Sequence, residues 1–96
     1  VLSHQKPLFE SPGYKTYGVS YDDTAVAYLS NTQSKVKTAQ TVIHEVTHCA
    51  GVKGTQRAEI IAEMRALKHI KEKPSYSDVK GIIKRITKDY PELPYK

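Results

Sequence analysis

Apolar residues recur at intervals of three and four over most of the chain beyond residue 33, and this spacing predicts helices. The first helix is expected over residues 34–50, because Gly51 follows it as the left-handed residue that commonly ends a helix. A second helix is expected over residues 55–71 and a third over 77–89. The side chains expected to face inward are Val36, Ala39, Val42, Ile43, Val46, Cys49 and Ala50, then Ile60, Ile61, Met64, Leu67 and Ile70, then Val79, Ile82, Ile83 and Ile86.

The segment 1–33 is expected to form loops and short strands, because Pro, Gly and Ser punctuate it. A strand is predicted over 25–30 (AVAYLS), between two turn-like clusters, and a shorter strand near 15–20 is expected to pair with it. With 96 residues the chain has room for one domain. We therefore expect a single, minimal α+β domain over 1–96, with about three helices and a small antiparallel sheet or hairpin near the N-terminus.

The net charge of +5 lies wholly in residues 65–96, which carry nine basic and four acidic residues. The third predicted helix is expected to present Lys80, Lys84, Arg85 and Lys88 on its outer side. A basic face of this kind is more often a solvated exterior than a binding patch, and the alternative is a module that binds nucleic acid or an anionic surface. The chain holds one cysteine, which excludes an internal disulfide, and no apolar run is long enough to predict a transmembrane helix.

The first predicted helix contains His44-Glu45-Val46-Thr47-His48, an HExxH motif. Residues four apart lie on one helical face, so both imidazoles can reach one metal ion. Glu45 lies about 100° further around the helix, where it can reach a water on that ion without binding the ion itself. The motif therefore predicts one zinc ion per chain, with His44 and His48 as ligands and Glu45 as general base.

A catalytic zinc takes a third protein ligand and keeps one position open. The candidates are Glu59, Glu63, His69, Cys49 and His4. The loop 52–54 is short, so the first two helices should form an antiparallel hairpin that places Glu59 level with His48. Glu63 would then lie level with His44. This geometry favours Glu59 as the ligand and Glu63 as a carboxylate that orients His44, although Glu63 stays open as the alternative ligand.

HExxH followed by the helical segment Glu59-Ile60-Ile61-Ala62-Glu63 resembles the gluzincin zinc metallopeptidases. It is similar to ImmA/IrrE-like peptidases and to the compact zincin toxin domains of bacterial polymorphic toxins. The resemblance covers residues 25–67 and implies a zincin-like fold and cleavage of a protein or peptide substrate. It also implies a toxin, effector or regulatory role and an inhibitor or immunity protein as a partner. Localisation stays open between a secreted or translocated effector and a cytoplasmic protein.

Cleavage also needs a donor that stabilises the oxyanion, and the tyrosines outside the predicted helix interiors are suitable. The candidates are Tyr17, Tyr21, Tyr90 and Tyr95. By the same resemblance, the strand over 25–30 would be the sheet edge along which a peptide lies extended. Two alternatives remain: the basic binding module, for which nucleic acid is the less favoured partner, and a zincin-like domain that binds a partner without activity.

Overall fold

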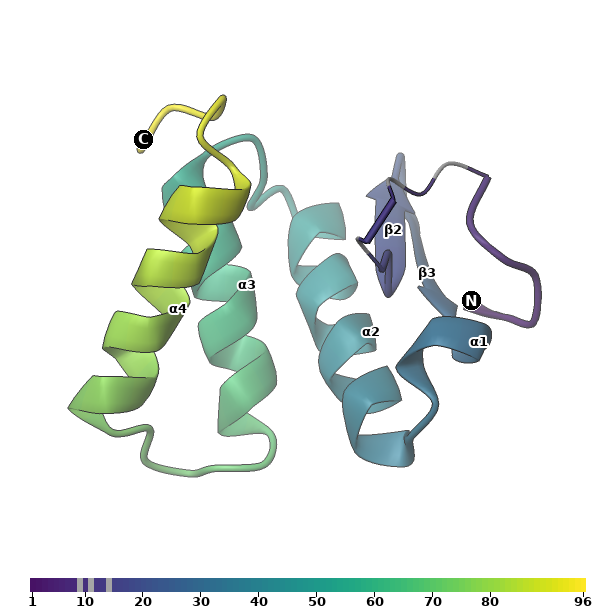
Figure 1. Ribbon diagram of the computed structural model, residues 1–96, viewed down its shortest axis with the longest axis horizontal. Helices are drawn as coiled ribbons and strands as arrows, with labels where there is room; N and C mark the ends of the chain where they lie inside the picture. The colour runs from purple at the N-terminus through teal and green to yellow at the C-terminus, as the bar shows by residue number, and fades with distance from the viewer. Residues whose placement is uncertain (9, 11, 14) are drawn as a thin grey trace.

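The computed structural model describes residues 1–8, 10, 12–13 and 15–96; residues 9, 11 and 14 of the expected N-terminal loop lie outside this set. Within the described residues the chain is an α+β domain, as predicted, with four helices and one three-stranded sheet. The elements are β1 (Leu2–Ser3), β2 (Gly18–Tyr21), β3 (Thr24–Tyr28), α1 (Leu29–Thr32), α2 (Lys35–Cys49), α3 (Gln56–Lys68) and α4 (Tyr76–Asp89). In Figure 1 the sheet, α2, α3 and α4 lie side by side in that order. No helix in the described part of the chain is both long and apolar enough to cross a membrane.

The sheet has the strand order β1-β3-β2, so β3 is central and β2 is an edge strand. β2 and β3 form the expected antiparallel hairpin, while β1 adds a short parallel strand that the sequence did not predict. The strand predicted over 25–30 ends at Tyr28, because the chain turns there into the short helix α1. The prediction that this strand is the free edge was therefore wrong: β2 has the open side.

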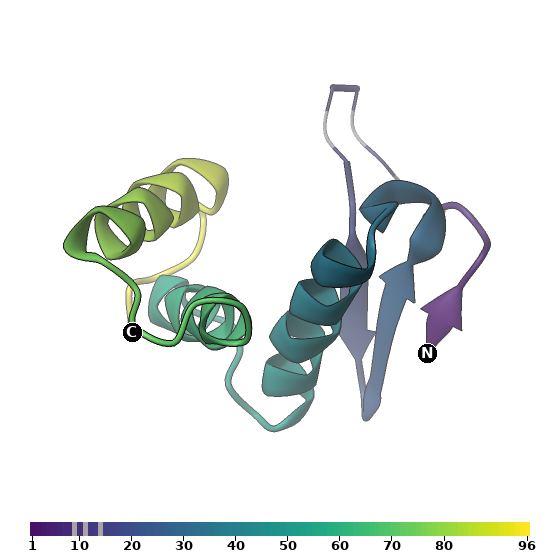
Figure 2. The same ribbon diagram turned by 90° about the horizontal axis from the view of Figure 1, so that it is seen from below.

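Helix α2 packs closely on the hairpin because the facing residues are small (Figure 2). A Cβ atom added to Gly18 would lie 2.5 Å from Thr41 Cγ2 and 2.6 Å from the Val26 carbonyl oxygen. Ala27, the β3 partner of Gly18, is only 1% exposed. Since directly paired residues of neighbouring strands point to the same face of the sheet, these small residues form the surface against which α2 packs.

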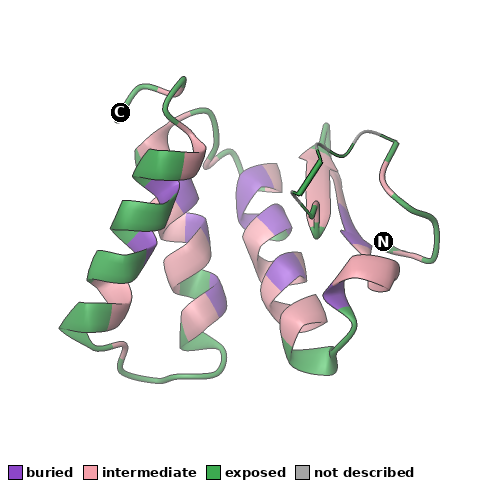
Figure 3. Ribbon diagram, in the orientation of Figure 1, coloured by how far each residue is buried: buried purple, intermediate pink, exposed green. Residues whose placement is uncertain are grey.

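The apolar faces of the helices differ in part from the prediction. The residues that α3 buries are Ala58, Glu59, Ala62 and Ala66, whereas Ile60, Ile61, Met64 and Leu67 are half-buried and Ile70 is exposed. On the other helices Val36, Val46 and Ile83 are exposed, while Ile82 and Ile86 are buried. Figure 3 shows buried residues along each of the helices α2, α3 and α4. Alanines at these positions let the α3 backbone come close to its neighbours, and the larger side chains flank the contact.

Polar caps fix the ends of the three long helices. Ser34, Thr55 and Ser75 each accept a hydrogen bond from a backbone N–H in the first turn of α2, α3 and α4. Two further N–H groups at the start of α3 donate to the C-terminal tail, from Gln56 to Pro94 at 2.8 Å and from Arg57 to Tyr95 at 2.9 Å. The tail therefore holds the first turn of the helix that carries Glu59.

Candidate metal centre

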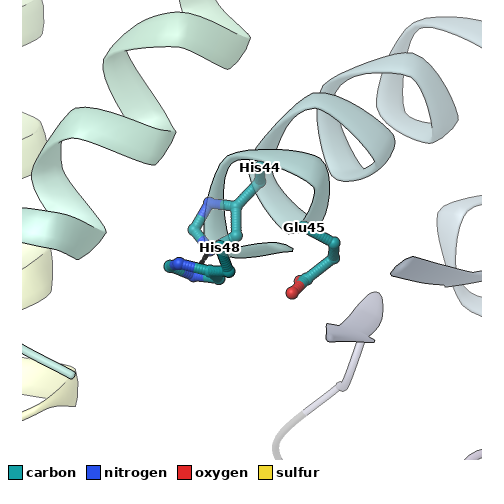
Figure 4. A group of neighbouring side chains, drawn as sticks. All are labelled: His44, Glu45 and His48. Atoms are coloured by element: carbon teal, nitrogen blue, oxygen red, sulfur yellow. Dashed lines mark hydrogen bonds between the residues drawn. The ribbon is translucent and has the colours of Figure 1, made fainter. Parts of the chain in front are cut away.

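His44 and His48 lie one turn apart on α2 and point their Nε2 atoms at a common region (Figure 4). The two Nε2 atoms are 3.0 Å apart, and the rings meet edge to face with centroids 4.6 Å apart. His48 is buried and His44 is nearly so. Two ring nitrogens this close need a proton or a cation between them, because two bare lone pairs repel each other.

The carboxylate of Glu59 reaches both imidazoles from the first turn of α3. Its Oε2 lies 2.9 Å from His48 Nε2 and its Oε1 lies 3.3 Å from His44 Nε2. Ligand atoms around a tetrahedral zinc with bonds of about 2.0–2.1 Å are separated by about 3.3 Å. The separations among His44, His48 and Glu59, here called the cluster, are 2.9 to 3.3 Å, with each Glu59 oxygen approaching a different imidazole. These donor types, at a spacing equal to or slightly below that value, are compatible with a zinc ion.

The other nitrogen of each imidazole also has an oxygen partner. His48 Nδ1 lies 2.7 Å from the Val52 carbonyl oxygen, just beyond the end of α2. His44 Nδ1 is buried without a well-aligned hydrogen bond, and Glu63 Oε1 is 2.8 Å away. A metal-binding histidine usually has an oxygen partner on its second nitrogen, because that contact fixes the tautomer and the ring orientation. Both histidines therefore have the surroundings of metal ligands.

Glu63 is in turn held by Arg85 of α4, whose Nη2 lies 2.5 Å from Glu63 Oε2. This contact joins α4 to the cluster through one intermediate carboxylate. Arg85 belongs to the basic face predicted for α4, and this contact gives it a second role. No local pattern could have indicated this role, because Glu63 and Arg85 lie on different helices.

The carboxylates raise the proton affinity of both imidazoles. Burial opposes protonation of His44, but its contacts with Glu59 and Glu63 outweigh burial and raise its pKa to about 9. The hydrogen bond to Glu59 raises the pKa of His48. Burial likewise opposes ionisation of Glu59, yet the two histidines lower its pKa to about 2. The cluster therefore favours positive charge at its centre, which a divalent cation can supply in place of protons.

Glu45 lies on the neighbouring side of α2, and its carboxylate turns back toward the side on which the two imidazoles lie (Figure 4). It is 9% exposed, and its Cγ would be 3.1 Å from a Cβ at Gly18 of β2. Burial raises the pKa of Glu45, while His44, His48 and the Ser20 hydroxyl act in the opposite direction. The ligand atoms of His44, Glu45 and His48 all lie within 4.8 Å of one another. Glu45 is thus near the centre of the cluster, but Glu59 is the carboxylate in contact with both Nε2 atoms.

A cleft of about 510 Å³ opens beside the cluster, between the segment around β2 and the helices α2, α3 and α4. Of the proposed ligands, His44 lines this cleft and His48 and Glu59 do not, while Glu45 and Glu63 line it beside His44. Of the four candidate tyrosines, Tyr17 and Tyr90 line this cleft. Tyr21 lies at the hairpin turn and Tyr95 in the tail, and both are more than half exposed.

The remaining predicted residues lie away from the cluster. Lys80, Lys84 and Lys88 are exposed on α4, as predicted for the basic face. His69 lines a separate, apolar groove on the other side of α2. Neither His4 nor Cys49 contacts the cluster among the described residues.

Comparisons of the chain with protein-family models, with curated proteins and with solved structures found no match.

Proposed function

We propose that this protein is a zinc-dependent metallopeptidase in which His44, His48 and Glu59 hold the metal. The observation that carries the proposal is the convergence of two Nε2 atoms and one carboxylate at separations of 2.9 to 3.3 Å, beside a solvent-accessible cleft. Zinc, when bound, polarises a carbonyl group and makes a water molecule more acidic. An oxygen partner on each Nδ1 supports the same assignment, because it fixes the direction of each ring.

Glu45 is the proposed general base and proton carrier. Its carboxylate lies at the border of the cluster and the cleft, so it can accept a proton from a water and deliver it to the leaving amine. Because burial raises its pKa, the proton that it accepts is held more firmly than at an exposed glutamate. Tyr17 and Tyr90 are the proposed oxyanion donors, since both line the cleft.

The substrate is proposed to be an extended peptide. β2 is an edge strand, and Gly18 at its start lines the cleft beside Glu45. A peptide added to this edge would make main-chain hydrogen bonds to β2 and pass in front of the cluster. This placement replaces the one predicted for the central strand β3.

Metal analysis is the first test. We expect about one zinc per wild-type chain and loss of zinc in His44→Ala and His48→Ala. His69→Ala is the matched control, because His69 lies outside the cluster. A protein that takes up no zinc after reconstitution, although folded, would exclude the proposal.

Glu45→Gln is the second test, measured as cleavage of a peptide mixture by the zinc-loaded protein. We expect the variant to retain zinc and to lose about 10²- to 10⁴-fold in rate, since it removes general-base catalysis. Glu72→Gln, an exposed substitution of the same kind, should leave the rate unchanged. Zinc binding with no cleavage by the wild type would instead favour a zincin-like domain that binds a partner without activity.

One observation favours a second function. Lys80, Lys84 and Lys88 form an exposed basic row on α4, and such a row can bind an anionic surface. Retention on DNA, RNA or anionic vesicles that falls as salt rises would support it. If the protein is not retained even at low salt, this function is excluded.

A further inference from the structure

The cleft beside the cluster carries charges of both signs. Its described lining includes three cations, Lys15, Lys37 and Arg85, and three carboxylates, Glu45, Glu63 and Asp89. The Arg85–Glu63 ion pair cancels two of these charges, and Glu45 is the proposed base. The two lysines then remain on the wall formed by α2 and the segment before β2, whereas Asp89 lies on α4.

Lys37 is held with its ammonium group in the cleft. Its Nζ lies 4.2 Å from the centroid of the Tyr17 ring, and both residues line the cleft. Within the described part of the chain, no carboxylate forms an ion pair with Lys37 or Lys15.

We propose that the cleft selects substrates with an acidic side chain, and that Lys37 is the specificity-determining residue, with Lys15 on the same wall. That the ligand is a substrate rests on the proposed peptidase function. The preference for negative charge rests on the two lysines, which form no ion pair within the described residues. Tyr17 supports the selection because its ring restricts the position of the Lys37 ammonium group.

The spacing predicts where the acidic residue lies. Lys37 precedes His44 by seven residues on α2, which is about 10 Å along the helix axis. An extended peptide advances about 3.3 Å per residue. The acidic side chain should therefore lie about three residues from the cleaved bond, on one side only.

The first experiment measures binding without turnover. Zinc-loaded Glu45→Gln protein is titrated with three fluorescein-labelled peptides that differ at one position, three residues from the centre, where they carry Glu, Gln or Lys. We expect the Glu peptide to bind up to about fivefold more tightly than the Gln peptide, the largest gain typical of one exposed charge pair, and the Lys peptide to bind most weakly. Equal binding of the three peptides, or no binding of any, would overturn the proposal.

The second experiment adds charge reversals to the same protein. Adding Lys37→Glu should reverse the order of the three peptides, and Lys37→Gln should abolish it. Lys35→Glu is the matched control, because it makes the same charge change in the same turn of α2. Lys35 lines the separate apolar groove that contains His69, not the cleft. If Lys35→Glu changes the order as much as Lys37→Glu, the selection comes from net charge and the assignment to Lys37 is wrong.

Cleavage by the wild type separates this proposal from the peptidase function. If the wild type cleaves no peptide while the Glu45→Gln protein still prefers Glu, the peptidase function fails and the selection of anions stands. If the wild type cleaves all three peptides with equal kcat/KM, the selection fails and the peptidase function stands. Mass spectrometry of the products from a mixed peptide library then gives the position of the acidic residue.

Discussion

Replacing the carboxylates of Glu59 and Glu63 one at a time should separate the metal ligand from the residue that orients His44. Glu59→Gln and Glu63→Gln keep the size of the side chain and remove its charge, so each tests one carboxylate with little change in packing. Glu59 contacts both Nε2 atoms, whereas Glu63 contacts Nδ1 of His44 and Arg85. Zinc affinity should therefore fall more in Glu59→Gln than in Glu63→Gln.

The contacts also set the expected magnitudes. Loss of a partner that orients a metal-binding histidine typically costs 10- to 100-fold in metal affinity, about 1.4–2.7 kcal/mol, and we expect a value in this range for Glu63→Gln. The loss of zinc affinity in Glu59→Gln should be larger than this range, because a metal ligand is lost. Arg85→Gln should cost less than about fivefold, since the Arg85 side chain is 53% exposed and an exposed ion pair contributes up to about 1 kcal/mol.

Competition against a chromophoric zinc chelator at pH 7.5 measures these affinities, and circular dichroism checks that each variant is folded. Lys84→Gln is the matched control for Arg85→Gln, because Lys84 is its exposed neighbour on α4. A larger loss in Glu63→Gln than in Glu59→Gln would make Glu63 the third ligand. Losses below about threefold in both variants would show that neither carboxylate binds zinc, and the proposed metal centre would be wrong.

Four further predictions concern stability and the C-terminal tail. Gly18→Ala should destabilise the protein by about 1–3 kcal/mol in urea unfolding, because the new Cβ has no space beside α2; unchanged stability would contradict that packing. The zinc-free protein should lose stability as pH rises from 6.5 through about 9. The pKa of His44 is raised in the folded protein, so its contribution to the free energy of unfolding is complete below pH 6.5 and is lost above the folded pKa. A free energy of unfolding in urea that does not change over this pH range would refute this. At acid pH, Glu59 should contribute stability that is lost as pH falls from 4.5 through about 2, which the same measurement tests. Deleting residues 94–96 removes two hydrogen bonds at the start of α3, so hydrogen exchange there should speed up and zinc affinity should fall by several fold; unchanged exchange would show that the tail does not hold this turn.

The sequence by itself determined the local features of this protein. The apolar period, the caps and Gly51 place α2, α3 and α4 within a few residues of their observed ends. The four-residue spacing of His44 and His48 puts both on one face of α2. These features depend on neighbours within about one helical turn, and a pattern along the chain carries that information.

The tertiary structure decided which elements meet. It made β3 the central strand, turned the alanines and Glu59 of α3 inward in place of the isoleucines, and brought Arg85 to Glu63. It also placed Lys37 beside Tyr17 in the cleft. Each of these contacts joins segments far apart in the chain or depends on how closely two elements pack. The packing of whole helix and sheet surfaces sets how the elements are rotated and spaced relative to one another. A local sequence pattern does not specify that packing.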